Sequence, residues 1–275
     1  FEVSILLRKK KINVIFTTGG YISAPCILGA KIAGVPILLH ESNAIPGKVT
    51  RLLGKFCDYV ALGISSTSDY LPGCRTIFTG TPVRSDFYLE HHLPNWVPTG
   101  EGVLIVIMGG SQGAIKMNEM VRNIQPWLIN KACRVVHLTG KTDCFYRNLD
   151  KYKNHPNFVV RHFSDEIPAL LQNADIVISR AGAGAISELM VTKTPSILIP
   201  FPNSTDYHQE FNAAYMARLG GAVIVNQHNP EKKILKNIIS KLIDSNSLAQ
   251  MKLNMNNIDC YNVENKIFNI IKSII

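Results

Sequence analysis

Short apolar runs alternate with polar or glycine-rich turns along most of the chain. The runs are rich in β-branched residues and too short for typical helices, which is the pattern of buried strands. They occur at residues 12–16, 35–39, 59–62, 76–78, 103–108, 134–138, 158–161, 176–178 and 196–199. Helical spacing lies between several of them and continues from Pro230 to Ile275. This alternation predicts an α/β fold with parallel sheets.

The alternation is interrupted once, at residues 91–102, which hold His, Pro and Gly without periodicity. A chain of 275 residues exceeds the usual single domain. We therefore predict two doubly wound, Rossmann-like domains, residues 1–90 and 103–275, joined by a linker at 91–102. The last helix can pack back on the first domain.

The chain begins at Phe1, without Met, inside an expected helix that runs directly into the first strand. We expect that an N-terminal portion precedes this sequence and that the first domain is incomplete, with an exposed strand edge.

Composition narrows the class of partner. Lys and Arg number 29 against 20 Asp and Glu, a net charge of +9 that favours phosphates or an anionic membrane surface. Nucleic acid is not expected, because the one dense basic run, residues 8–11, has no aromatic motif beside it. No apolar stretch is long enough to span a membrane, and the six cysteines lack metal-site spacing, so we expect reduced thiols, a cytosolic protein and no metal.

A glycine-rich turn, GGSQGA at residues 109–114, follows a predicted strand and precedes a helix. Backbone N–H groups and the helix dipole favour an anion there by about 0.3 to 2 kcal/mol. The turn can equally need glycine for its shape alone. No Walker motif is present.

A second bare turn, SRAGAGAISE at residues 179–188, opens another predicted helix near Gly184. Glu188, expected in the first turn of that helix, can complement the helix N-terminus or accept hydrogen bonds from two ribose hydroxyls. The following strand ends in Phe201 and Pro202 instead of a carboxylate, which disfavours a nicotinamide enzyme.

Polar clusters follow two strands of the first domain. His40 and Glu41 end one strand and are either a satisfied pair or catalytic groups. Arg84 follows the proline turn TGTPVR and is either a surface arginine or a diphosphate clamp. No D-x-D motif occurs, so arginine and helix dipoles would have to neutralise a sugar diphosphate without metal.

Four motifs in this order resemble the MurG family of peptidoglycan glycosyltransferases: HESNAIPG at 40–47, TGTPVR at 79–84, GGSQGA at 109–114 and SRAGA…SE at 179–188. The resemblance covers nearly the whole chain. It implies the two-domain GT-B fold, with the nucleotide sugar on the C-terminal domain and the acceptor on the N-terminal one. The family's N-terminal glycine-rich loop with its histidine has no counterpart here.

The resemblance also implies roles for residues at matching positions. Asn43 would face the donor sugar, as would Gln209, while Arg84 and Ser111, with Gln112, would face the diphosphate. Phe163 and Ser164 would flank the uracil. The remaining residues would line the nucleotide, with Glu188 on the ribose: Ala183, Gly184, Ala185, Ile186, Ser187 and Glu188.

The implied reaction transfers N-acetylglucosamine from UDP-N-acetylglucosamine to the C4 hydroxyl of lipid I, giving lipid II by inverting displacement, without cofactor. His40 or Glu41 is the general base that this chain offers. The implied location is peripheral, on the cytoplasmic face of the bacterial inner membrane.

Two alternatives remain, a UDP-N-acetylglucosamine 2-epimerase and a non-catalytic UDP-sugar-binding remnant. Because the N-terminal loop is missing, we expect the chain as given to bind UDP but to transfer sugar poorly.

Overall fold

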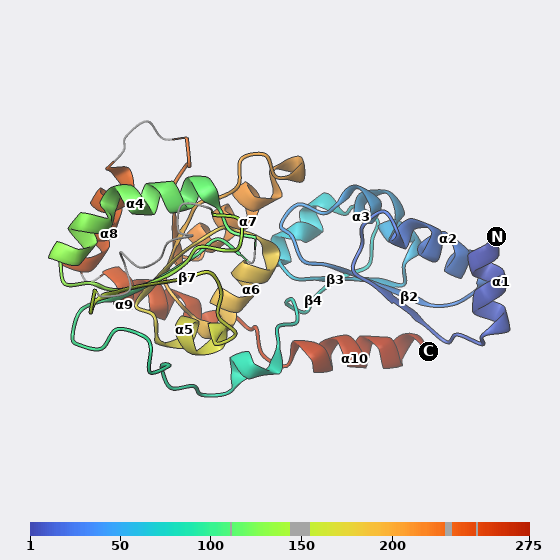
Figure 1. Ribbon diagram of the computed structural model, residues 1–275. Coiled ribbons are helices and arrows are strands. Elements are labelled where there is room, and N and C mark those ends of the chain that lie inside the picture. Colours follow the sequence, from blue (N-terminus) through green and yellow to red (C-terminus); the bar gives the residue numbers. More distant parts are fainter. Residues whose placement is uncertain (111, 144–154, 229–232, 246) are drawn as a thin grey trace. The chain divides into compact units, whose positions relative to one another are not determined.

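The computed structural model describes residues 1–110, 112–143, 155–228, 233–245 and 247–275 (Figure 1). The chain divides into two compact units. Unit 1 comprises Phe1–Val83, Thr205–Asn212 and Asp259–Ile275, and unit 2 comprises Arg84–Ser204 and Ala213–Ile258. The linker at 91–102 and the boundaries beside it stay predictions.

Unit 1 is built on a parallel four-stranded sheet in the order β1-β2-β3-β4. Its strands are β1 (Ile15–Thr17), β2 (Ile37–Glu41), β3 (Tyr59–Leu62) and β4 (Thr76–Phe78). Its helices are α1 (Glu2–Lys9), α2 (Ser23–Ala33), α3 (Lys48–Leu53) and α10 (Val263–Ile274). α2 ends at Gly34 with a φ of 73°, a conformation that glycine adopts without strain.

Successive residues of β2 face opposite sides of this sheet, as the period of two requires. Ile37 and Leu39 pack with Ile27 of α2 and Leu7 of α1, whereas Leu38 packs with α10. Figure 1 shows α10 and α2 on opposite faces of the sheet. Covered on both faces, β2 is buried at all five positions, which explains its continuous apolar run.

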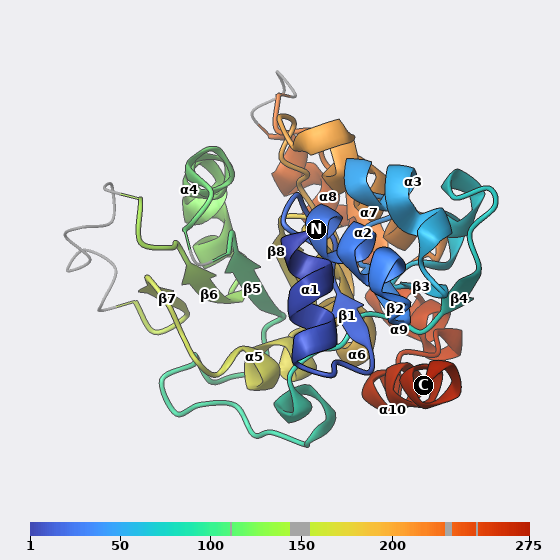
Figure 2. The same ribbon diagram turned by 90° about the vertical axis from the view of Figure 1, so that its right-hand side faces the viewer.

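Unit 2 contains a parallel six-stranded sheet in the order β10-β9-β8-β5-β6-β7. Figure 2 labels four of these strands, β5, β6, β7 and β8. Its strands are β5 (Leu104–Met108), β6 (Arg134–Leu138), β7 (Phe158–Arg161), β8 (Ile176–Ser179), β9 (Ser196–Leu198) and β10 (Ala222–Ile224). Its helices are α4 (Ile115–Asn130), α5 (Ile167–Asn173), α6 (Ala183–Thr192), α8 (Ile234–Asp244) and α9 (Ser247–Asn254); α7 (His208–Arg218) begins in unit 1 and ends in unit 2.

The strand order of unit 2 reverses at β5. β5 pairs with β6 on one side and with β8 on the other, so the chain leaves β5 toward one edge and returns beside it. Open α/β sheets bind ligands at such a switch point, outside the carboxyl ends of the strands.

The predicted α/β class with two doubly wound parallel sheets is confirmed. Two details of the prediction were wrong. β10 was missed, since three residues after a Gly-Gly pair give no recognisable pattern. The helical run from Pro230 to Ile275 is interrupted, because α8, α9 and α10 are separate helices; Pro230 itself lies outside the described residues. No helix in the described ranges is long and apolar enough to cross a bilayer.

Candidate functional site

The carboxyl edge of the unit 2 sheet presents the two glycine-rich turns side by side. One follows β5 and the other follows β8, and these strands are hydrogen-bonded neighbours with Met108 opposite Ser179. The two turns therefore lie at adjacent strand ends, as the position of a switch point requires. Ser111 lies outside the described residues, and Gln112 is exposed on the first turn.

Glycine is required at particular positions of the first turn. A Cβ on Gly109 would come within 2.8 Å of the backbone nitrogen of Ala114, so the start of the turn packs directly on the approach to α4. Gly110 has a φ of 85° but an open Cβ position. The turn is thus closely packed at Gly109 and open at Gly110, where a ligand can approach the backbone closely.

The turn after β8, which leads into α6, is open as well. α6 begins at Ala183 with Gly182 as its N-cap, and a Cβ on Gly182 or Gly184 would meet no atom within 4 Å. Ile186 is buried, and the buried Ser187 hydroxyl donates to the Ala183 carbonyl at 2.8 Å. The side chains of Ile186 and Ser187 therefore serve the helix, while Ala183, Gly184, Ala185 and Glu188 keep exposed surface.

Glu188 lies in the second turn of α6, not in the first as the sequence predicted, because the helix starts at Ala183. Partial burial raises the pKa of its carboxyl group, and the charge of Arg84 counteracts that rise. Arg84 belongs to unit 2, exposed at the N-cap of a short 3-10 helix, η3 (Ser85–Tyr88), that contacts α6. A carboxylate and an arginine thus lie near one another beside the open helix start.

Phe163 and Ser164 follow β7, the outermost strand on the β6 side of the sheet. Phe163 is half exposed and offers a ring face for stacking. Ser164 is buried, and its hydroxyl accepts from the Glu166 N–H at 3.1 Å. The Ser164 side chain is therefore used in the local turn.

In unit 1, His40 and Glu41 are buried and fully engaged. His40 Nε2 is 2.9 Å from the Gly80 carbonyl oxygen and its Nδ1 is 3.3 Å from Ser42 Oγ. Burial lowers the pKa of His40, so the ring is neutral near pH 7.

Glu41 closes the turn between β2 and α3. Its carboxylate accepts from the N–H groups of Asn43 and Gly47 at 3.1 and 2.9 Å and from the Thr50 hydroxyl at 2.8 Å. Both ring nitrogens of His40 and both carboxylate oxygens of Glu41 thus have partners within unit 1. We propose that both position the turn in place of the catalytic role expected from the sequence.

Asn43 is held from two sides. Its Nδ2 donates to Glu41 Oε1 at 3.3 Å, and its Oδ1 accepts from Asn212 Nδ2 at 3.2 Å. Asn212 is fully buried and also accepts from the Ala44 N–H at 2.8 Å. Sequence reasoning missed Asn212, whose spacing of three residues from Gln209 along α7 was the available signal. Gln209 is half-buried at the start of α7.

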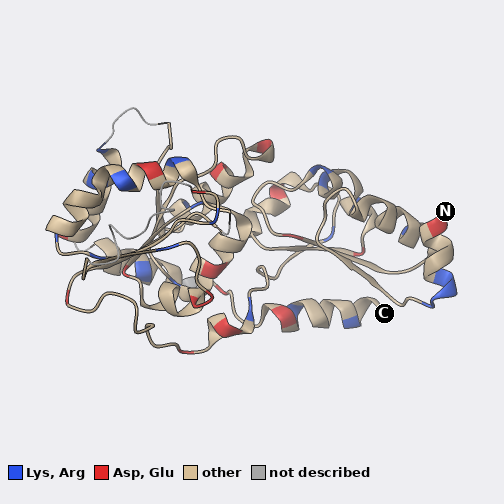
Figure 3. Cartoon of the chain, in the orientation of Figure 1, with Lys and Arg blue, Asp and Glu red and all other residues tan. Residues whose placement is uncertain are grey.

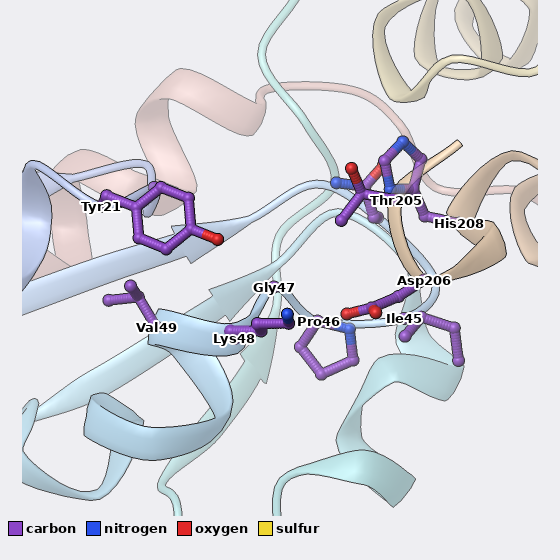
Figure 4. A pocket seen from close by; sticks show the side chains of 11 residues that line it. Tyr21, Ile45, Pro46, Gly47, Lys48, Val49, Thr205, Asp206 and His208 are labelled. Atoms are coloured by element: carbon purple, nitrogen blue, oxygen red, sulfur yellow. The ribbon is translucent and has the colours of Figure 1, made fainter. Parts of the chain in front are cut away.

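A pocket of about 200 Å³ lies in unit 1 beside Asn43. The pocket is lined by residues from three segments (Figure 4). They include Tyr21 from the turn after β1, Lys48 at the start of α3, and Asp206 and His208 from the segment Thr205–Asn212. Arg51 and Asp206 form an ion pair next to the pocket. Asn43 is the predicted site residue that lines it.

The structure thus gathers the predicted residues in two places. Unit 2 holds Arg84, Gln112, Phe163, Ser164, the start of α6 and Glu188. Unit 1 holds His40, Glu41, Asn43 and Gln209. Within the described residues, no three His, Cys, Asp or Glu side chains are grouped to hold a metal ion.

Two family models match the chain. Residues 1–62 match the glycosyltransferase family 28 N-terminal domain, and residues 104–266 match the C-terminal domain of the same family. Both halves of a family 28 glycosyltransferase are therefore represented, in the order of the two sheets.

Close relatives narrow the class further. A Prochlorococcus marinus (strain NATL2A) protein named UDP-N-acetylglucosamine–N-acetylmuramyl-(pentapeptide) pyrophosphoryl-undecaprenol N-acetylglucosamine transferase is 78% identical over 99% of this chain and 78% of its own length. A protein of the same name from Synechococcus sp. (strain WH7803) is 54% identical over 88% of this chain and 66% of its own length. The chain belongs to the MurG family of glycosyltransferases.

Solved structures support the fold. The crystal structure of Acinetobacter baumannii MurG has a TM-score of 0.82 at 23% identity and covers 99% of this chain and 77% of its own. A putative UDP-N-acetylglucosamine 2-epimerase from Listeria monocytogenes has a TM-score of 0.73 at 14% identity, covering 99% of this chain and 77% of its own. At these identities the likeness concerns the fold alone.

Proposed function

We infer that this protein transfers N-acetylglucosamine from UDP-N-acetylglucosamine to lipid I, giving lipid II for peptidoglycan synthesis. The observation that carries this function is the 78% identity to the Prochlorococcus transferase over 99% of the chain. The reaction is an inverting displacement. The C4 hydroxyl oxygen of the acceptor forms a bond to the anomeric carbon, the bond from that carbon to the diphosphate breaks, and the hydroxyl proton leaves to a base.

The geometry of unit 2 supports a donor site at its carboxyl sheet edge. The open positions at Gly110, Gly182 and Gly184 let a diphosphate approach the backbone, and Arg84 adds a positive charge. Donors that are already in place stabilise the departing UDP, and each is typically worth about 10² to 10³ in rate. In this proposal Glu188 contacts the ribose and Phe163 stacks on the uracil.

One assay tests this function against its alternatives. Radiolabelled UDP-N-acetylglucosamine and a lipid I analogue are expected to give labelled lipid II and one UDP per transfer. An epimerase would instead form the C2 epimer from the donor alone. UDP affinity is measured on the same preparation, and absence of both UDP binding and lipid II would contradict the proposed function.

We also propose that unit 1 attaches peripherally to the anionic cytoplasmic face of the bacterial inner membrane. α1 and α2 pack together and expose apolar side chains, including Ile5 and Leu6 on α1, Leu28 and Ile32 on α2, and Ile22 at the N-cap of α2. The basic run at residues 8–11 lies at the end of α1, partly visible in blue in Figure 3. Apolar and basic side chains in one region are the combination that binds such surfaces.

Replacing Lys9, Lys10 and Lys11 by glutamine is expected to weaken binding to phosphatidylglycerol vesicles by about 100-fold, since each lysine near the surface contributes about 1 kcal/mol. Vesicle flotation at low and high salt measures this. The matched control replaces Lys236, Lys241 and Lys252 of unit 2 by glutamine, which removes the same charge elsewhere. Equal losses in the two triple variants would show that net charge, and not this region, attracts the membrane.

A further inference from the structure

Two glycine turns of unit 2 are in direct backbone contact. They follow β5 and β6, paired strands with Met108 opposite Leu138. Gly113 and Gly140 have φ angles of 88° and 77°. A Cβ on Gly140 would lie 2.2 Å from the Gly113 Cα, and one on Gly113 would lie 2.3 Å from the Thr139 oxygen. A displacement of the turn at 139–143, after β6, must therefore displace the turn at 109–113, after β5.

Asn118, the fourth residue of α4, forms hydrogen bonds to the turn after β6. It is fully buried. Its Nδ2 donates to the Thr139 carbonyl at 2.9 Å and to Asp143 Oδ2 at 2.7 Å. Its Oδ1 is 3.0 Å from His137 Nε2. The carboxamide of Asn118 thus connects α4 to both ends of the turn at 139–143.

The groups around Asn118 leave its carboxamide one orientation. His137 is fully buried, and burial lowers its pKa to about 3, so the ring is neutral. Because Nδ2 of Asn118 faces two acceptors, Oδ1 faces His137, and the ring then donates its Nε2–H to Oδ1. Asp143 is also buried, and its charge is balanced by Arg122 Nη1 at 3.0 Å. A flipped carboxamide would place its oxygen against the Thr139 carbonyl oxygen and the carboxylate of Asp143, which are both acceptors.

A second connection lies at the surface. The Thr142 N–H donates to the Gln112 carbonyl at 3.2 Å, and the Thr142 hydroxyl donates to the same oxygen. Thr142 is exposed, so this connection can be changed without disturbing the core.

We propose that Asn118 is a positioning residue for the donor diphosphate: through the turn at 139–143 it holds the backbone of Gln112 and Gly113, and with it the end of the glycine turn that the diphosphate approaches. The proposal rests on the proposed function, which puts a nucleoside diphosphate at this sheet edge. It extends that function by assigning a role to a side chain that touches no substrate.

The Asn118→Asp variant tests this proposal, because it keeps the volume and replaces the donor of two hydrogen bonds by an acceptor. We expect affinity for UDP to fall at least about tenfold, within the range for unmade buried hydrogen bonds. Affinity for uridine, which lacks the diphosphate, is expected to stay unchanged. In transfer assays KM for the donor should rise while KM for the acceptor stays constant. Calorimetry with UDP and with uridine measures the difference.

The control is Thr194→Val. Thr194 is buried and donates to the Leu171 carbonyl at 2.7 Å, before β9 and so at the amino-terminal end of the sheet. This variant loses that hydrogen bond and the one between the Thr194 and Thr192 hydroxyls, and it should keep wild-type affinity for UDP. A folded Asn118→Asp protein that binds UDP within twofold of wild type, or that loses uridine and UDP affinity equally, would overturn the proposal.

A milder variant covers the case in which Asn118→Asp does not fold. Thr142→Val removes one surface hydrogen bond, and we expect about threefold weaker UDP binding with unchanged uridine binding. Unchanged UDP binding in this variant would also count against the proposal. If wild-type protein binds UDP no better than uridine, the proposed donor site itself is wrong, an outcome distinct from failure of the variants.

Discussion

Replacing Glu41 by glutamine is expected to lower the free energy of unfolding of unit 1 by about 2 to 3 kcal/mol, the range for hydrogen bonds to a charged group. The buried carboxylate accepts from Asn43, Gly47 and Thr50. Glutamine has the same shape, but its NH₂ group would face donors in place of an acceptor. The Asn43 and Gly47 amides should consequently exchange faster in hydrogen-exchange measurements.

The matched control is Asp58→Asn, the same carboxylate-to-amide change in the same unit. Asp58 Oδ2 accepts from the Ile37 N–H at 2.8 Å, and the side chain is half-buried. We expect a cost of about 1 kcal/mol there. Glu41 would lose its proposed positioning role if its variant were no less stable than the control.

Replacing Glu188 by alanine is expected to weaken UDP binding by about 1.5 to 3 kcal/mol, because an ionised carboxylate can accept from both ribose hydroxyls. Isothermal titration calorimetry measures the loss. The variant should bind 2′,3′-dideoxy-UDP as the wild type does, since that nucleotide lacks both hydroxyls. Glu119→Ala, an exposed change on α4, is the control and should leave UDP affinity unchanged.

The same residue predicts a pH dependence. Burial raises the pKa of Glu188, so the carboxylate protonates at a higher pH than an ordinary glutamate does. A protonated carboxyl group accepts fewer hydrogen bonds, and UDP affinity should therefore decline as pH falls toward that pKa. Glu188→Ala should remove this part of the decline. Identical pH profiles for both proteins would place Glu188 outside the ribose site.

Local pattern was enough to find the glycine turns and most strands. β5 and β8 are buried on both faces and read as continuous apolar runs, and each is followed at once by glycine. The turn geometry needs glycine whatever surrounds it, as the φ values of Gly110 and Gly113 show. These signals lie within a few residues of each other along the chain.

Local pattern did not show which atoms the polar side chains contact. His40 and Glu41 read as catalytic because they follow a strand end, yet burial and hydrogen bonds occupy them. Ser164 and Ser187 stay predicted residues of the nucleotide site, and the structure adds that their hydroxyls form hydrogen bonds within their own segments. A sequence shows that a polar residue is near a site; its direction depends on neighbours brought in by the fold.

The sequence by itself determined the α/β class, the order of the strands along the chain, the glycine turns and, through its motifs, the family. The tertiary structure alone decided that β8 returns beside β5, that Asn212 reaches Asn43 and Ala44 across 169 and 168 positions, respectively, and that Asn118 joins two turns. The reason is physical: strand and turn preferences are set by adjacent residues, whereas the partner of a buried carboxamide is set by the packing of the whole unit.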